Sequence, residues 1–182
     1  MSRIQVISGQ FRGLKLDSSK NEGLRPTKDR VKESVFDILQ FEIVGKNFFD
    51  AFGGTGQMGI EALSRGAKEV TIVEHDKEAA NLIKKNISKI KARQNLNFVK
   101  ADTIEFLKNS NISIDIAFLD PPYHEEKLLY ETFKLVIPKT NSDAIIITET
   151  LSAHTAQNNV ENFYLQKKYK YGNISLNLYK KQ

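Results

Sequence analysis

From residue 46 onward, short apolar runs alternate with stretches in which apolar residues recur at helical spacing. Five runs rich in β-branched and aromatic residues predict strands, at residues 47–52, 69–74, 95–101, 113–119 and 143–149. The clearest helix covers 76–93, where Asp76 can cap the start and Ala80, Ile83 and Ile87 recur on one side. Near-continuous apolar strands separated by helices predict a doubly wound α/β fold, with a parallel sheet covered on both faces.

Both ends of the chain depart from this alternation. Residues 163–171 and 174–179 flank Gly172-Asn173, a turn signal, and predict an antiparallel hairpin that closes the sheet edge. Ile174, Leu176 and Leu178 are expected to face inward from it.

The N-terminal end predicts a separate extension. Residues 3–7 and 13–17 read as a small hairpin, and 27–41 as a helix with Thr27 as a possible cap. We therefore divide the chain into an extension at 1–45 and a main domain at 46–182.

Composition restricts the chemistry. The 182 residues contain no cysteine and three scattered histidines, so we expect no metal site, disulfide or thiolate nucleophile. Neither a secretory signal nor a run of membrane-spanning length is evident, which predicts a cytoplasmic protein without membrane contact.

Positive charge is concentrated near the N-terminus. Of the formal net charge of +5, residues 1–32 hold eight basic and three acidic side chains. A second cluster interleaves lysines with tyrosines at 164–171. Such runs suit phosphate contact and base stacking, and they also suit a solvated strand face, so charge alone leaves nucleic-acid binding open.

A glycine-rich segment follows the first predicted strand. "DAFGGTGQMG" at 50–59 places Gly54, Gly56 and Gly59 in a G-x-G-x-x-G pattern, and Glu74 ends the next strand. In nucleoside-binding folds such glycines let the backbone approach the ligand, and the acid binds ribose hydroxyls. The pattern favours a nucleoside-bearing cofactor and leaves NAD and S-adenosylmethionine open.

Acidic residues also end the third and fourth strands. Asp102 follows the third, where it can contact a ligand, cap the helix predicted at 103–109, or do both. The fourth ends at Asp120-Pro121-Pro122-Tyr123. Two prolines fix two φ angles and remove two N–H donors, so the carbonyls of this turn are rigidly held and available to a donor from outside.

These motifs, in this order, resemble the amino-methylating S-adenosylmethionine-dependent methyltransferases. The N-terminal segments "ISGQFRGLKL" (7–16) and "LRPTKDRVKESVFDIL" (24–39) narrow the resemblance to the RsmD family, guanine-N2 methyltransferases of bacterial small-subunit ribosomal RNA. The resemblance spans nearly the whole chain. It implies a Rossmann-like class I fold with a seven-stranded, mostly parallel sheet. Some positions depart from the family pattern: Phe11, Lys15, Lys32, Gly53, Gln57 and Met58.

The resemblance also implies roles for individual residues. The catalytic residues would be Asp120, Pro121, Pro122 and Tyr123, with Asp120 and the Pro121 carbonyl accepting the amine N–H groups and Tyr123 stacking on the base. The cofactor-binding residues would be Asp50, Gly54, Gly56, Glu74, Asp102, Thr103 and Thr27. RNA phosphates would contact Arg3, Arg12, Lys15, Arg25 and Arg30. S-adenosylmethionine would leave as S-adenosylhomocysteine. The expected partner is small-subunit rRNA or the 30S subunit, bound by a monomer.

Three other functions compete with this interpretation. A DNA adenine or cytosine amino-methyltransferase would share Asp-Pro-Pro-Tyr, but the chain has no extra segment for DNA target recognition. A nicotinamide-dependent oxidoreductase would explain the glycines and Glu74 but not Asp-Pro-Pro-Tyr. A non-catalytic RNA-binding module would keep the fold without the reaction.

Overall fold

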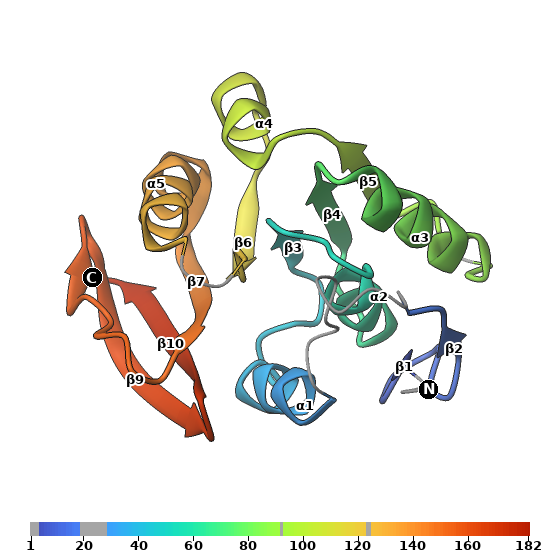
Figure 1. Cartoon of the computed structure of the whole chain (residues 1–182), viewed down its shortest axis with the longest axis horizontal. Helices are drawn as coiled ribbons and strands as arrows, with labels where there is room; N and C mark the ends of the chain where they lie inside the picture. The colour runs from blue at the N-terminus through green and yellow to red at the C-terminus, as the bar shows by residue number, and fades with distance from the viewer. Residues whose placement is uncertain (1–3, 19–28, 92, 123–124) are drawn as a thin grey trace.

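The centre of the molecule is a twisted eight-stranded sheet (Figure 1). The structure is a computed structural model, and it describes residues 4–18, 29–91, 93–122 and 125–182. The strand order is β5-β4-β3-β6-β7-β10-β9-β8. The five parallel strands are β3 (Asn47–Asp50), β4 (Glu69–Glu74), β5 (Leu96–Lys100), β6 (Ile114–Leu119) and β7 (Thr140–Leu151). All five coincide with strands predicted from the sequence, so the doubly wound α/β prediction is confirmed.

Helices cover both faces of this sheet (Figure 1). One face packs against α1 (Asp29–Ile38), α2 (Gln57–Ser64) and α3 (Lys77–Ser88), and the other against α4 (Thr103–Asn109) and α5 (Glu126–Val136). A short 3-10 helix, η1 (Ile137–Lys139), links α5 to β7. Two buried clusters follow from strand alternation: Phe48 belongs to the first, on the α1–α3 face, and Phe49 to the second. After β3 the chain continues to β4 on one side of the neighbouring strands β3 and β6, and after β6 it continues to β7 on the other side. In sheets of this type, ligands bind at the carboxyl ends of the two strands where the strand order reverses.

The C-terminal hairpin is present, and the sheet has one more strand than predicted. β9 (Phe163–Tyr171) and β10 (Ile174–Lys181) pair antiparallel across Gly172, and β10 pairs antiparallel with β7. A two-residue strand, β8 (Asn159–Val160), forms the actual edge, so the seven-strand count was wrong by this short segment. Its two residues give no alternation for a sequence pattern to reveal. Ile174 and Leu176 are buried, whereas Leu178 is only partly buried.

Helix boundaries follow capping chemistry. Asp76 accepts a hydrogen bond from the Ala79 N–H at 2.8 Å and begins α3, as predicted. That helix ends at Ser88, five residues earlier than the apolar spacing suggested. Among the described helices, none is long and apolar enough to cross a membrane.

The N-terminal hairpin, β1 (Ile4–Gln5) and β2 (Lys15–Leu16), forms a separate two-stranded sheet docked on α2. The buried Glu61 carboxylate accepts the Ile7 and Ser8 N–H groups at 2.8 and 3.0 Å. A Cβ at Gly9 would lie 1.8 Å from the Ser64 carbonyl oxygen, so only glycine fits this contact. The hairpin is therefore held in a fixed position against the sheet layer.

Two of the residues that depart from the family pattern, Lys32 and Phe11, have structural roles in the interior of the protein. Lys32, on α1, is fully buried and donates to the Gln5 carbonyl at 2.7 Å, so it cannot reach RNA phosphates as an arginine-like surface residue would. Phe11 packs partly buried against the core. Residues of α1 belong to the same core cluster as residues of the sheet. The division of the chain at residue 45 therefore stays a prediction.

Asn86 on α3 joins the extension to the glycine-rich loop. Its side chain is fully buried; it accepts the Asp17 N–H at 2.7 Å and donates to the Asp17 and Thr55 carbonyls at 3.0 and 2.9 Å. Asp17 also forms ion pairs with Lys85 and Lys89 at 2.8 and 2.9 Å, and these lysines lower the pKa of its carboxyl group. One amide thus ties the N-terminal extension to the glycine-rich loop.

Removal of this amide is expected to destabilise the fold. Asn86→Ala leaves the Asp17 N–H and the Thr55 carbonyl without their partner, which should lower the free energy of unfolding by about 1–3 kcal/mol. Urea unfolding measures the change. Asn81→Ala, at an exposed position of the same helix, is the matched control and should cost much less. Equal losses in the two variants would contradict the role given to Asn86.

Candidate active site at the carboxyl edge of the sheet

The glycine-rich loop leaves β3 and enters α2 through backbone angles that glycine adopts easily. Gly54 and Gly56 have φ of 53° and 77°, and Gly56 caps α2. A Cβ at Gly53 would lie 2.5 Å from Ile72 Cγ2, which explains the extra glycine. Gly54 faces open space, so a ligand can approach its backbone.

A row of four carboxylates crosses the sheet beside this loop. Glu74, Asp50, Asp120 and Glu149 lie within two residues of the carboxyl ends of β4, β3, β6 and β7, which are consecutive in the sheet. The residues two positions earlier all belong to the core cluster on the α1–α3 face: Ile72, Phe48, Phe118 and Ile147. Since side chains alternate along a strand, the four acids project from that same face.

Two of the four acids, Asp50 and Glu74, contact the glycine-rich loop, and Asp50 is the more buried of the two. It is 1% exposed, and its Oδ2 accepts the Gly59 N–H at 3.3 Å. Burial raises the pKa of Asp50 to about 7, and the negative charge of Glu74 adds to the shift. Because burial makes the ionised form of Asp50 unfavourable, a positively charged ligand group beside it would stabilise the carboxylate.

Glu74 organises the loop from the neighbouring strand. Its Oε2 accepts the Gly54 N–H and its Oε1 the Asp76 N–H, both at 2.8 Å. Each oxygen keeps a second lone pair for a ribose hydroxyl. The predicted placement of Glu74 beside the glycines is therefore present in the structure, and its ribose contact stays a prediction.

Asp102 and Thr103 lie after β5, on the same sheet edge. Asp102 is exposed and caps α4 by accepting the Glu105 N–H at 3.0 Å, as the capping interpretation predicted. Thr103 is buried, and its hydroxyl donates to the Ala51 carbonyl at 2.6 Å. This bond ties α4 to the end of β3, so any cofactor contact by Thr103 would use its remaining lone pairs or its backbone.

Asp120 lies between the end of β6 at Leu119 and the Pro121-Pro122 turn. Burial raises the pKa of its carboxyl group well above the ordinary range, with further contributions from Glu149 and then Asp50, although the side chain keeps some solvent contact. Perturbed carboxylates of this kind cluster at functional sites. Tyr123 lies outside the described residues.

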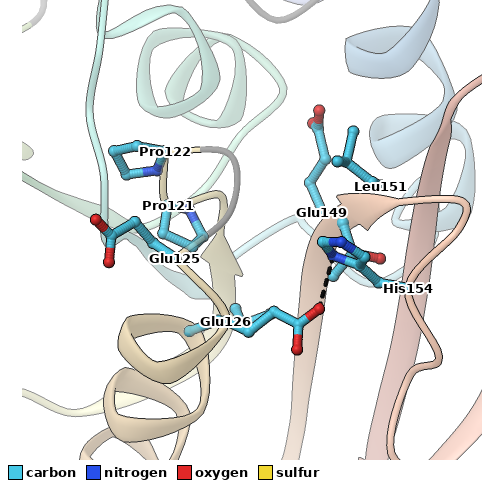
Figure 2. Close-up of a pocket in the computed structure, with 9 residues that line it drawn as sticks. Pro121, Pro122, Glu125, Glu126, Glu149, Leu151 and His154 are labelled. Atoms are coloured by element: carbon cyan, nitrogen blue, oxygen red, sulfur yellow. Dashed lines mark ion pairs between the residues drawn. The ribbon is translucent and has the colours of Figure 1, made fainter.

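A crevice opens beside this turn (Figure 2). Pro121 and Pro122 form one side, while Glu149, Leu151 and His154 form the other. An ion pair of 2.8 Å between His154 Nδ1 and Glu126 Oε1 spans from the segment after β7 to α5. The site thus adjoins a partly open hollow, lined by apolar side chains and by Glu125, Glu126, Glu149 and His154, rather than a closed core.

The predicted RNA-binding residues that the structure describes are all on the surface. Arg12 lies in the hairpin turn, Lys15 on β2 and Arg30 on α1, and all three are exposed. Arg3, Arg25 and the cofactor candidate Thr27 lie outside the described residues. No group of three or more His, Asp or Glu residues arranged to hold a metal occurs in the part of the chain that is described.

Sequence reasoning missed Glu149. The signal was available, because the fifth predicted strand ends in an acid as the second and fourth do. What the sequence did not supply was the strand order, which places β7 next to β6 and so puts Glu149 beside Asp120.

Known proteins are similar to this chain in sequence and in fold. The family described as "Conserved hypothetical protein 95" matches residues 4–180. The Ribosomal RNA small subunit methyltransferase D of Escherichia coli K12 is 34% identical over 99% of this chain and 91% of its own length. The chain belongs to this family.

Solved structures agree with the fold of this family. A methyltransferase candidate from Escherichia coli has a TM-score of 0.85 and 34% identity, covering 100% of this chain and 99% of its own. A more distant methyltransferase candidate, solved in complex with SAH, is 14% identical, with a TM-score of 0.73 over 92% of this chain and 54% of its own; it supports the fold alone. The family resemblance predicted from the sequence is thereby confirmed, and the protein is a methyltransferase.

Proposed function

We propose that this methyltransferase transfers a methyl group from S-adenosylmethionine to the N2 amine of a guanine in bacterial small-subunit rRNA. The observation that carries the proposal is the placement of Asp120 and its two prolines next to Asp50 and the glycine loop, which brings an amine acceptor and a cofactor cradle to one crevice. The named function of the full-length relative supports the rRNA substrate. We further propose that it acts as a monomer in the cytoplasm, on the assembled or assembling 30S subunit.

The residues present fit S-adenosylmethionine. Asp50 would hold the cationic methionine end, since its buried carboxylate gains most from a positive partner. The open backbone at Gly54, in the turn that it forms with Gly56, would pack against the same end, and Glu74 would bind the ribose. Asp102 and Thr103 would lie on the adenine side. When bound, the cofactor supplies a sulfonium-activated methyl group, whose C–S bond breaks as the N2–C bond forms.

The task of the protein is to orient a poor nucleophile. The N2 lone pair is delocalised into the guanine ring, and the amine carries two N–H groups. Asp120 and the Pro121 carbonyl would accept one each, drawing electron density toward nitrogen and fixing its direction. The raised pKa of Asp120 also suits it to take the proton that the amine loses after transfer. Positioning of this kind can supply roughly 7–11 kcal/mol of the barrier reduction.

Product analysis tests the proposal directly. The protein is incubated with labelled S-adenosylmethionine and unmethylated small subunits, and the RNA is digested to nucleosides. Label is expected in N2-methylguanosine. In a parallel incubation with DNA, label in methylated adenine or cytosine would favour the competing amino-methyltransferase, and NAD binding without label transfer to either substrate would favour the oxidoreductase.

RNA affinity is expected to depend steeply on salt. Arg12 and Lys15 are exposed on the docked hairpin, where they would bind phosphates. Replacing both with glutamine should weaken binding and reduce the slope of log K against log salt by about 0.7–0.9 for each phosphate that is no longer neutralised. Filter binding at salt concentrations from roughly 50 to 200 mM measures the slope. Lys134→Gln, exposed on α5 across the sheet, should leave it unchanged.

A further inference from the structure

The fourth acid of the row has no role in the reaction described above. We propose that Glu149 makes the enzyme selective for guanine by accepting the N1–H that lies next to the methylated amine. This inference rests on the proposed function and names the feature of the target base that the site reads.

The strand register places Glu149 directly beside Asp120. Leu119 of β6 pairs with Thr148 of β7, so the next positions along the two parallel strands are Asp120 and Glu149. Both project from the face that carries the cofactor loop. Two carboxylates in adjacent strands can therefore face two neighbouring donors on one ring edge.

Glu149 is also held firmly at the crevice. Its residue is 4% exposed, and it pairs with Leu176 of β10, which is fully buried. β7 lies between β6 and β10 in the interior of the sheet, so the backbone that carries Glu149 is fixed on both sides. In Figure 2 the Glu149 side chain extends along the wall opposite Pro121 and Pro122. A rigid acceptor at a binding site discriminates more strongly than a mobile one.

The base edges differ in the group beside the exocyclic amine. In guanine the N2 amine is flanked by N1–H, a donor. In adenine and cytosine the corresponding ring nitrogen beside the amine is an acceptor lone pair. An acceptor pair would therefore satisfy guanine with two hydrogen bonds, but it would set a carboxylate against a lone pair in the other two bases. Glu149 thus explains how an Asp-Pro-Pro turn common to several amine substrates can choose guanine.

A base analogue tests the N1–H. 2-Aminopurine keeps the 2-amino group, presents an acceptor at N1 and lacks the O6 of guanine, so the comparison of wild-type protein with the Glu149 variant assigns the part of the preference that is due to N1. The target position, mapped by partial nuclease digestion of the labelled RNA, is rebuilt in synthetic RNA as guanine or as 2-aminopurine, and kcat/KM is measured for each. The wild-type protein should prefer guanine by about tenfold or more, because a hydrogen bond to a charged group is lost with the analogue.

The Glu149→Gln variant should lose this preference. Its amide can donate to N1 of 2-aminopurine as well as accept from guanine, so the ratio of the two kcat/KM values should fall toward one or reverse. The affinity for S-adenosylmethionine should stay near that of the wild type, which separates base reading from general damage. Asp143→Asn, exposed at the opposite end of β7, should keep the wild-type preference.

The outcomes separate this inference from the function on which it rests. Failure of the wild-type protein to label N2 of guanine would overturn the proposed function. Label at N2 with an unchanged preference in Glu149→Gln would overturn the role of Glu149 alone. Should that variant not fold, equal use of guanine and 2-aminopurine by the wild-type protein would have the same meaning.

Discussion

Replacing Asp120 with alanine is expected to lower kcat for rRNA methylation about 10²–10³-fold, the usual effect of removing one preorganised polar group from a reacting centre. The variant loses the acceptor that would orient the amine, while the glycine loop, Asp50 and Glu74 remain. Binding of S-adenosylmethionine and of RNA should therefore persist. Single-turnover methylation, with calorimetry for the cofactor and filter binding for RNA, measures the three quantities separately.

At saturating S-adenosylmethionine, which removes the contribution of Asp50 to cofactor binding, the pH dependence of kcat/KM for RNA should report ionisation of the Asp120 carboxyl group. Burial and the neighbouring acids Glu149 and Asp50 raise the Asp120 pKa, so the protonated form, which accepts an amine N–H less well, persists to higher pH than for an ordinary aspartate. Activity should rise with pH through that raised value and level off above it. Asp120→Asn, which cannot ionise, should lack this limb in its residual activity.

An exposed carboxylate on the strand next to Asp120 provides the control for both measurements. Asp143→Asn removes an exposed carboxylate from the other end of the adjacent strand and should leave rate and pH profile unchanged. Undiminished methylation by Asp120→Ala would remove the proposed acceptor from the mechanism. RNA binding by the wild-type protein with no methylation of any substrate would instead favour the non-catalytic module.

The parts of the fold that could be read from the sequence are those with a strong local signal. Apolar β-branched runs located the five parallel strands, and Asp76 and Asp102 located two helix starts, because capping depends on residues three apart. The two-residue strand β8 was missed, since its pairing with β9 is set by the hairpin rather than by its own residues. Long-range order was likewise invisible, which is why the buried position of Lys32 and its bond to Gln5 were unexpected.

The candidate site was predictable where strand ends alone define it. Each strand that ends in an acid marks the carboxyl edge of a parallel sheet, and the glycines mark the loop that faces it. How these acids affect one another depends on strand order and register. Burial and the neighbouring acids raise the pKa values of both Asp50 and Asp120. Neither burial nor the distance between residues on different strands can be read from the order of residues in the sequence.

Replacing Asp50 with asparagine is expected to weaken S-adenosylmethionine binding about 10- to 150-fold, the effect of losing a hydrogen bond to a charged group. In the wild-type protein the Asp50 carboxyl group has a pKa of about 7, so a cationic ligand must drive its ionisation. Cofactor affinity should consequently fall as pH drops below about 7, with proton release on binding. Calorimetry in buffers of different ionisation enthalpy measures both effects, and Asp37→Asn, exposed on α1, should show neither change.

The same substitution should stabilise the protein without its cofactor. A carboxyl group whose pKa is raised from 3.8 to about 7 on folding costs nothing below the lower value, an increasing amount between the two, and the full amount above about 7. Asp50→Asn removes that cost, which the pKa change sets at about 4 kcal/mol at pH 8, and keeps an oxygen for the Gly59 N–H. Burial of the asparagine amide offsets part of the gain, so the free energy of unfolding should exceed that of the wild type by on the order of 2 kcal/mol. The gain should shrink at about pH 5.5, where the wild-type carboxyl group is largely protonated in the folded state. A variant that binds the cofactor less and resists urea more would show that Asp50 is kept charged for ligand binding at the expense of stability; unchanged cofactor affinity would instead assign Asp50 to the loop architecture alone.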